Sequence, residues 1–450
     1  MLCAYQIEII DRELDGILYQ ALHLAARGIP LLIGDRMVNQ FIKTTTSPVL
    51  FLDKDQNRKT NTAVLNHGGL VINLNAEGQG FADNPPQVQI NFARVINYTS
   101  KVCVWGQLQY DILCDLIPDE QREKVIITGH PSFDLASPRF NDYYRDQAIV
   151  GRYGEDYTLI NTSFAMFNHQ MGFDYYMKML SGMDEWKVYG TPEHIEHLKK
   201  RCVHQERTAL ALIDLAKTIA QTYPDRHVII RPHPAENPDF YLKRIEGFDK
   251  ITVTSEGTVR KWISTAATVI HHDCTTGMEA ALMGKLVLQF EPFEGIIGSM
   301  KTLQRVGHRT TSPSKILELM KSGVMPNETQ AALHAQLRKY LANIDGNAGE
   351  AVATVAEALG KGFETILPGK FGLRKELKCW RKYASKLLRA HQPGRNGRKV
   401  RYALSKFARL RQDEVERRLA RLAQFEPTLP EVDITRLCMN NFLITPKGMA

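Results

Sequence analysis

A regular alternation of short apolar runs with amphipathic segments most constrains what this chain can fold into. Residues 3–10 have the composition of a strand, residues 12–28 that of an amphipathic helix ending at Gly28, and residues 29–33 that of a second strand. Further strand-like runs lie at residues 49–52, 70–75, 101–105 and 125–128. Strands that alternate with helices in this way predict a doubly wound α/β sheet.

The same alternation starts again after a polar, aromatic stretch at residues 141–144, which we interpret as a domain boundary. Strand-like runs follow at residues 158–161, 228–230, 268–270 and 286–290, and helices are predicted over residues 193–222, 314–321, 328–344 and 350–359. A chain of 450 residues is too long for one ordinary domain. We therefore expect α/β domains at residues 1–150 and 151–365 and a basic helical extension at residues 366–450.

Two prolines end the strand predicted at residues 228–230. The sequence there is Val-Ile-Ile-Arg-Pro-His-Pro-Ala-Glu, from Val228 to Glu236. Because proline cannot donate to a sheet ladder, Arg231 and His233 are expected just beyond the carboxyl end of the strand. Ligands of open α/β sheets bind at that end. The alternative is a rigid loop that carries a surface arginine and histidine.

A second polar stretch follows the strand predicted at residues 268–270. Asp273, Thr275 and Thr276 are residue types that favour the start of a helix, and a helix is predicted from Met278. A helix start offers backbone N–H groups to an anion, and here the N–H of Gly277 and two hydroxyls would add to it. The two strand ends together predict a site for a phosphate-bearing ligand. Structural capping is the alternative.

The net charge of +8 is unevenly distributed. Residues 370–421 contain 18 Lys and Arg against 4 Asp and Glu, so the remainder is acidic. Apolar residues at helical spacing, including Leu377 and Trp380, predict a basic amphipathic helix that binds an anionic membrane surface. A helix packed on the body and a nucleic-acid contact are the alternatives, although no nucleic-acid fold is recognised. A chain ended near Leu367 is expected to stay folded and to lose membrane binding.

Metal-binding and disulfide signals are weak. Asp53 and Asp55 have the spacing of a metal-binding DxD, but the pair opens a charged loop and is interpreted as a solvated turn. The seven cysteines are scattered singly and include no CxxC, which is typical of reduced thiols in a cytoplasmic protein. No apolar run approaches the roughly 20 residues that a membrane-spanning helix needs.

Several short motifs, in this order, resemble those of the bacterial surface carbohydrate biosynthesis protein family. They are Asn75-Ala76-Glu77-Gly78, Trp105-Gly106, the run from Gly129 to Leu135, the run from Leu159 to Phe164, the run from Arg231 to Glu236 and the run from Thr276 to Ala280. The resemblance covers about residues 7–363, and the chain departs from the family at His130-Pro131. The His-Pro element is more distantly similar to that of capsule-type Kdo transferases, bacterial sialyltransferases and polyol-phosphate polymerases.

The resemblance implies a GT-B-like pair of Rossmann-type domains facing a cleft, with the acceptor on the N-terminal and the nucleotide on the C-terminal domain. Arg231 and His233 would meet the donor phosphates, and His233 would stabilise the departing nucleotide. Asp273, Thr275, Thr276 and Gly277 would complete the phosphate site, and Glu279 would contact the ribose. Glu77 is the first candidate for the base that deprotonates the acceptor, and Glu13 the second.

The implied activity is a metal-independent glycosyltransferase without a cofactor, at the inner face of the cell membrane. It would transfer a sugar from a nucleotide-sugar, with CMP-linked donors among the candidates, to a surface polysaccharide or lipid-linked glycan. A CDP-linked polyol-phosphate transferase and a non-catalytic scaffold of glycan assembly are the alternatives.

Overall fold

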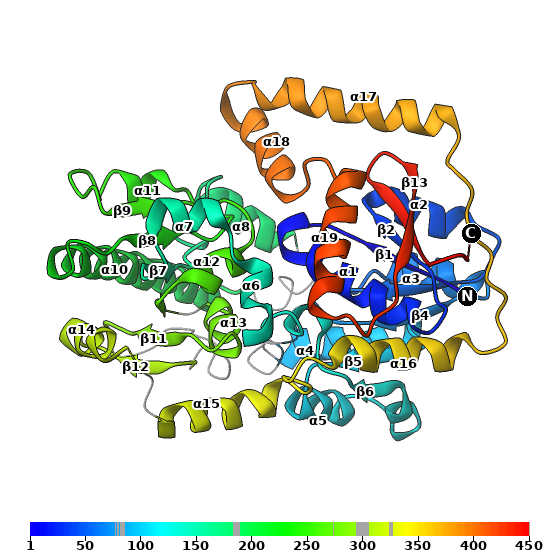
Figure 1. Cartoon of the computed structure of the whole chain (residues 1–450), viewed down its shortest axis with the longest axis horizontal. Coiled ribbons are helices and arrows are strands. Elements are labelled where there is room, and N and C mark those ends of the chain that lie inside the picture. The colour runs from blue at the N-terminus through cyan, green and yellow to red at the C-terminus, as the bar shows by residue number, and fades with distance from the viewer. Residues whose placement is uncertain are drawn as a thin grey trace. The chain divides into compact units, whose positions relative to one another are not determined.

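The structure is a computed structural model that describes residues 1–76, 78, 81, 86–182, 190–272, 274–293, 306–323 and 327–449, with the side chains of 327–330 and 395 excepted. The chain forms two compact units (Figure 1). Unit 1 comprises Met1–Leu135 and Arg338–Ala450, and unit 2 comprises Ala136–Leu337. The first unit is therefore built from both ends of the chain.

Unit 1 has an eight-stranded sheet in the order β13-β14-β2-β1-β3-β4-β5-β6. Its six parallel strands are β1 (Leu2–Gln6), β2 (Leu31–Gly34), β3 (Val49–Asp53), β4 (Leu70–Asn73), β5 (Lys101–Val104) and β6 (Val125–Ile127). The connecting helices include α1 (Ile10–Ala25), α2 (Arg36–Thr44), α3 (Arg58–Asn66), α4 (Pro86–Ala93) and α5 (Gln107–Asp115). The strands read as apolar runs because the sheet is buried on both faces.

The return of the chain to unit 1 corrects the expected boundaries at residues 150 and 365. Helix α16 (Ala348–Gly360) packs against α1, and the Gln20 amide donates to the carbonyl of Gly349 at 3.0 Å. The buried Asp134 carboxylate accepts the N–H groups of Ala348 at 3.0 Å and Gly349 at 2.6 Å, which satisfies the start of α16. The turn from Gly129 to Asp134 thus stabilises the start of α16 within unit 1.

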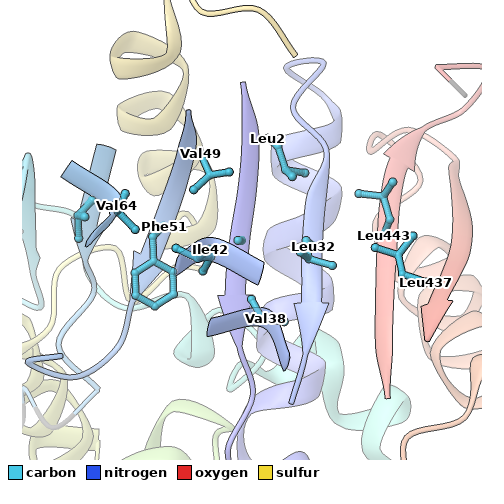
Figure 2. Packing of buried hydrophobic residues seen from close by; sticks show 11 residues of the cluster. Leu2, Leu32, Val38, Ile42, Val49, Phe51, Val64, Leu437 and Leu443 are labelled. Atoms are coloured by element: carbon cyan, nitrogen blue, oxygen red, sulfur yellow. The ribbon is translucent and has the colours of Figure 1, made fainter. Parts of the chain in front are cut away.

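The segment at residues 366–450 is also more than the expected helical extension. After α17 (Leu373–Ala390), α18 (Gly394–Lys406) and α19 (Gln412–Phe425), it forms the hairpin of β13 (Val432–Cys438) and β14 (Asn441–Pro446). Strand β14 pairs antiparallel with β2. Figure 2 shows Leu437 and Leu443 beside Leu32, within the same buried cluster. The hairpin closes an otherwise open edge of the sheet, and its apolar side chains become core.

Unit 2 has a six-stranded parallel sheet in the order β12-β11-β10-β7-β8-β9. Its strands are β7 (Thr158–Asn161), β8 (Val228–Arg231), β9 (Ile251–Val253), β10 (Thr268–His271), β11 (Leu286–Phe290) and β12 (His308–Thr310). Its longer helices are α8 (Phe173–Ser181), α10 (Pro192–Thr222) and α14 (Pro313–Ser322), and α15 (Asn327–Tyr340) extends past its end. The α/β class and the pair of Rossmann-type units that a GT-B-like fold requires are confirmed.

The strand order of unit 2 reverses direction beside β7. The chain runs from β7 outward to β8 and β9, then crosses to the other side of β7 to form β10, β11 and β12. Such a switch point opens a crevice at the carboxyl ends of the two strands that flank it, here β7 and β10. Within the part of the chain that the structure describes, no helix is both long and apolar enough to span a membrane.

Candidate functional site

Four neighbouring strands of unit 2 carry a polar residue at matching positions near their carboxyl ends. Arg231 on β8 is in register with Asn161 on β7, which is in register with His271 on β10, which is in register with Gln289 on β11. Residues paired in register project from the same face of a sheet. A buried polar row therefore crosses the switch point, with side chains no more than 8% exposed.

Several atoms of this row have no hydrogen-bond partner among the described residues. They are both amide atoms of Asn161, Nδ1 of His271 and Oε1 of Gln289. A buried polar atom without a partner costs about 1–3 kcal/mol. Their grouping at one edge favours a site where a bound group or ordered water completes the hydrogen bonds.

Backbone carbonyls fix the orientation of the His271 and His272 rings, and burial keeps both rings neutral. The Nε2 of His271 lies 2.7 Å from the carbonyl of Val306, and the Nδ1 of His272 lies 2.9 Å from the carbonyl of Phe290. Because a carbonyl only accepts, each of these nitrogens carries the proton and the other is an acceptor. Burial lowers the pKa of His271 to about 4 and also lowers the pKa of His272. Both rings therefore suit a ligand hydroxyl or N–H group.

Gly277 is explained by its contact with His271. A Cβ at position 277 would lie 2.4 Å from Nε2 of His271, so only glycine lets α13 (Thr276–Leu282) approach the ring. The expectation that the Gly277 N–H binds phosphate is corrected, because it donates to the carbonyl of Cys274 at 3.1 Å. Thr275 and Thr276 are half-buried, and the Thr276 hydroxyl donates to Sγ of Cys274 at 3.0 Å.

His233 lies on the exposed, proline-flanked turn after β8. Its Nδ1 accepts the N–H of Ala235 at 3.2 Å, so in the neutral ring Nε2 carries the proton and is a donor. Its own N–H donates to the buried Glu236 carboxylate at 3.2 Å. A donor ring at this place suits an oxygen of a phosphate or a sugar.

Glu236 joins the loops that follow β7 and β8. Its carboxylate accepts the Thr162 hydroxyl at 3.0 Å and the Phe164 N–H at 2.8 Å, in addition to the N–H of His233. Burial raises the pKa of Glu236, and these hydrogen bonds oppose the rise. A buried carboxylate with several donors fixes the position of both loops.

Arg231 does not face the switch point as expected for a phosphate ligand. Its guanidinium donates to the carbonyls of Glu256, at 2.8 Å, and Gly257, in the loop after β9, and lies over the Trp262 ring. The sheet order places β9 on the side of β8 away from β7. The side chain therefore braces the outer loop of the sheet.

Glu279, expected to contact a ribose, forms an ion pair instead. Its Oε2 lies 2.6 Å from Nε of the buried Arg260 on α12 (Val259–Thr265), and Arg260 also donates to the Tyr144 hydroxyl. The pair ties α13 to α12. A ribose contact would have to compete with a short, largely buried ion pair.

Two expected site residues, Glu77 and Asp273, lie outside the described residues. Glu13 binds Lys54 at 2.8 Å and accepts the N–H of Ile9 at 2.9 Å, so it closes the start of α1. Asp53 is not in a solvated turn. It is 2% exposed and accepts the amides of Asn61 and Asn73, and burial raises its pKa to about 6.

Comparison with known proteins gives distant likenesses of fold. No protein-family model and no curated protein matches the chain. Among solved structures, it is similar to the UDP complex of MnaA from S. aureus, at 11% identity and a TM-score of 0.45, over 82% of this chain and 99% of that one. The UDP-GlcNAc 2-epimerase from Neisseria meningitidis bound to UDP-GlcNAc is similar at 12% identity and a TM-score of 0.43, over 80% of this chain and 99% of that one.

A third similar structure is the wall teichoic acid polymerase TagF with CDPG, at 11% identity and a TM-score of 0.39, over 71% of this chain and 73% of that one. Such low identities and TM-scores assign no activity to this chain.

Proposed function

We propose that this protein is a transferase that moves a sugar from a nucleotide-activated donor to a surface-polysaccharide or lipid-linked glycan acceptor. The observation that carries the proposal is the polar row Asn161–His271–Gln289 beside the switch point of unit 2, with its unpartnered buried atoms. In parallel α/β sheets, nucleotides bind at such a switch point.

The donors and acceptors at this edge match the two halves of a nucleotide-sugar. The Nε2–H of His233 is a donor for a phosphate oxygen, and charge stabilisation of this kind promotes departure of the nucleotide. The acceptor nitrogens of His271 and His272 suit ligand hydroxyls, directly or through ordered water. The half-buried hydroxyls of Thr275 and Thr276 add polar groups beside them.

Glu77 remains our candidate for the base that deprotonates the acceptor hydroxyl. The resemblance of Asn75-Ala76-Glu77-Gly78 to the surface carbohydrate family supports this role. A base acts on the acceptor and not on the nucleotide, so Glu77→Gln should lose turnover and keep its affinity for the donor. Loss of donor affinity would make Glu77 a binding residue instead.

Membrane association through residues 370–421 is part of the proposal. Helix α17 has no buried residue, and its apolar side chains include Leu373 at 74% exposure and Leu388 at 75%. Exposed apolar side chains beside a dense positive charge suit an anionic bilayer surface. The protein should pellet with anionic vesicles at low salt and be released by about 0.5 M salt. Equal binding to neutral vesicles would contradict this electrostatic attachment.

The donor is identified by titrating the full chain with CMP-, CDP-, UDP- and GDP-linked compounds. Binding of one class with transfer of its sugar to a glycan acceptor supports the proposal. Transfer of a polyol phosphate from a CDP-linked compound would assign the polymerase-like reaction. Failure to bind any of the four classes would favour a non-catalytic scaffold.

A further inference from the structure

A pocket of about 420 Å³ lies in unit 1 at the start of α19, beside the β13–β14 turn. Its lining includes Arg409, Arg411 and Arg436 together with the buried residues Leu410, Met439 and Asn440. The Asn440 Oδ1 accepts the N–H of Leu410 at 3.0 Å, which joins the β13–β14 turn to the segment before α19. Three guanidinium groups thus line a pocket that also has buried apolar side chains.

The electrostatics of this pocket favour an anion. Asp413 is the only carboxylate of the lining, against three guanidinium groups. The pKa of Asp413 is lowered, chiefly by its hydrogen bond to Arg411, so the positive potential acts on the one carboxylate of the lining. The first-turn N–H groups of the 14-residue helix α19 add to that potential.

Two of the arginines are positioned by α17. Arg409 stacks over the Trp380 ring at 4.6 Å, and Arg436 pairs with Glu376. The Glu376 carboxylate also accepts the Trp380 indole N–H at 3.0 Å and the Met439 N–H at 2.8 Å. The pocket is therefore continuous with the basic amphipathic helix whose apolar side chains are exposed.

We propose that this arginine pocket binds a phosphomonoester or diphosphate group. Guanidinium groups match phosphate oxygens in pairs, and the three arginines exceed by one charge the two carboxylates that pair with them, Asp413 and Glu376. The group belongs either to a lipid headgroup beside α17 or to a soluble phosphate compound. All residues of the pocket lie in unit 1, so the inference does not depend on the nucleotide site of unit 2.

The test compares full-length wild type with Arg411→Ala, Arg411→Lys and the control Arg381→Ala. Arg381 is an exposed residue of α17 outside the pocket, so its loss removes the same charge from the same segment. Binding is measured to vesicles of a neutral carrier lipid that contain either phosphatidic acid, a phosphomonoester, or phosphatidylglycerol, a phosphodiester, at matched negative surface charge. Inorganic pyrophosphate is titrated in a second arm without vesicles. Unchanged thermal unfolding shows that each variant is folded.

A lipid headgroup predicts that the wild type prefers phosphatidic acid by about tenfold, the size expected for one charge-assisted hydrogen-bond pair. Arg411→Ala should lose that preference, and Arg411→Lys should keep little of it because lysine lacks the planar guanidinium group. Arg381→Ala should weaken binding to both kinds of vesicle equally. A soluble ligand predicts loss of pyrophosphate binding in Arg411→Ala without a lipid preference. If Arg411→Ala and Arg381→Ala behave alike in both arms, the pocket is not a phosphate site.

Discussion

The His271 ring lies against the Cα of Gly277, and a methyl group added at position 277 would lie 2.4 Å from Nε2 and 2.7 Å from Cδ2. The ring is fully buried, and its Nε2 is fixed on the carbonyl of Val306. The start of α13 is thus held at one distance from the sheet edge by a side chain of β10. The placement of Thr275 and Thr276 depends on this contact.

Gly277→Ala should therefore lower the free energy of unfolding by about 1–3 kcal/mol, the usual cost of overpacking, and weaken nucleotide binding. Gly151→Ala is the matched control, because Gly151 lies in α7 (Gln147–Tyr153) with no atom within 4 Å of the added Cβ. The control should be neutral or more stable by about 0.5–1 kcal/mol. Denaturant unfolding measures the free energy of unfolding of both variants. Equal stability of the two would show that the His271 ring does not require glycine at position 277.

The buried His271 also predicts a pH dependence of stability. Its folded pKa of about 4 lies below the ordinary value of 6.5, because burial disfavours the cation. The unfolded chain then binds the extra proton first as pH falls. The contribution of the neutral His271 ring to the free energy of unfolding is fully present above pH 6.5. It is lost between pH 6.5 and 4, at up to about 1.4 kcal/mol per pH unit. The unfolding free energy of His271→Asn should fall less steeply over this window, and parallel pH profiles would show that His271 is not responsible.

His233→Ala should reduce sugar transfer by about 10²–10³, because it removes one positioned donor to the departing phosphate. Stability should change by less than about 1 kcal/mol, since the ring is exposed and its hydrogen bond to the Ala235 N–H is a local contact within the turn. His197→Ala, an exposed histidine on α10 of the same unit, is the control and should keep full activity. Near-normal turnover of His233→Ala would leave the ring with a structural role.

Ending the chain near Leu367 should prevent stable folding of unit 1, contrary to the expectation from sequence. The truncation removes β14 from its pairing with β2 and deletes the buried Phe442, Leu443 and Ile444. Each such side chain contributes about 1.5–3 kcal/mol, and the loss approaches the whole stability of a domain. Replacing residues 373–406 with a flexible linker should instead keep the protein folded and abolish vesicle binding. A soluble, cooperatively unfolding truncated chain would contradict the role of the hairpin.

The parts of the fold that local patterns determine were predictable. Strand β7 was predicted with its observed ends, Thr158 and Asn161, because a short run with Leu159 and Ile160 at its centre is followed by the polar residues Thr162 and Ser163. The β13–β14 hairpin was missed because its pairing partner β2 lies about 400 residues away and the charge of the segment suggested helix alone. His233 was chosen as a candidate because two prolines mark its turn, and the structure places it on that exposed turn.

Other site residues could not be found from local sequence. Asn161 and Gln289 each look like an ordinary polar residue near a strand end. Their alignment with His271 follows from the strand order of the sheet, which no local pattern records. The burial of Arg231 by the loop after β9 has the same origin.

Hydrogen–deuterium exchange of the full chain, with and without a bound nucleotide or nucleotide-sugar, locates the nucleotide on the protein. A site at the switch point predicts slower exchange in peptides covering residues 158–164, 228–236 and 268–279, which surround the switch point between β7 and β10. Exchange in β9 and β12, at the two outer edges of the same sheet, should not slow. Protection confined to unit 1, or no protection with any nucleotide that binds, would contradict a nucleotide site at this edge.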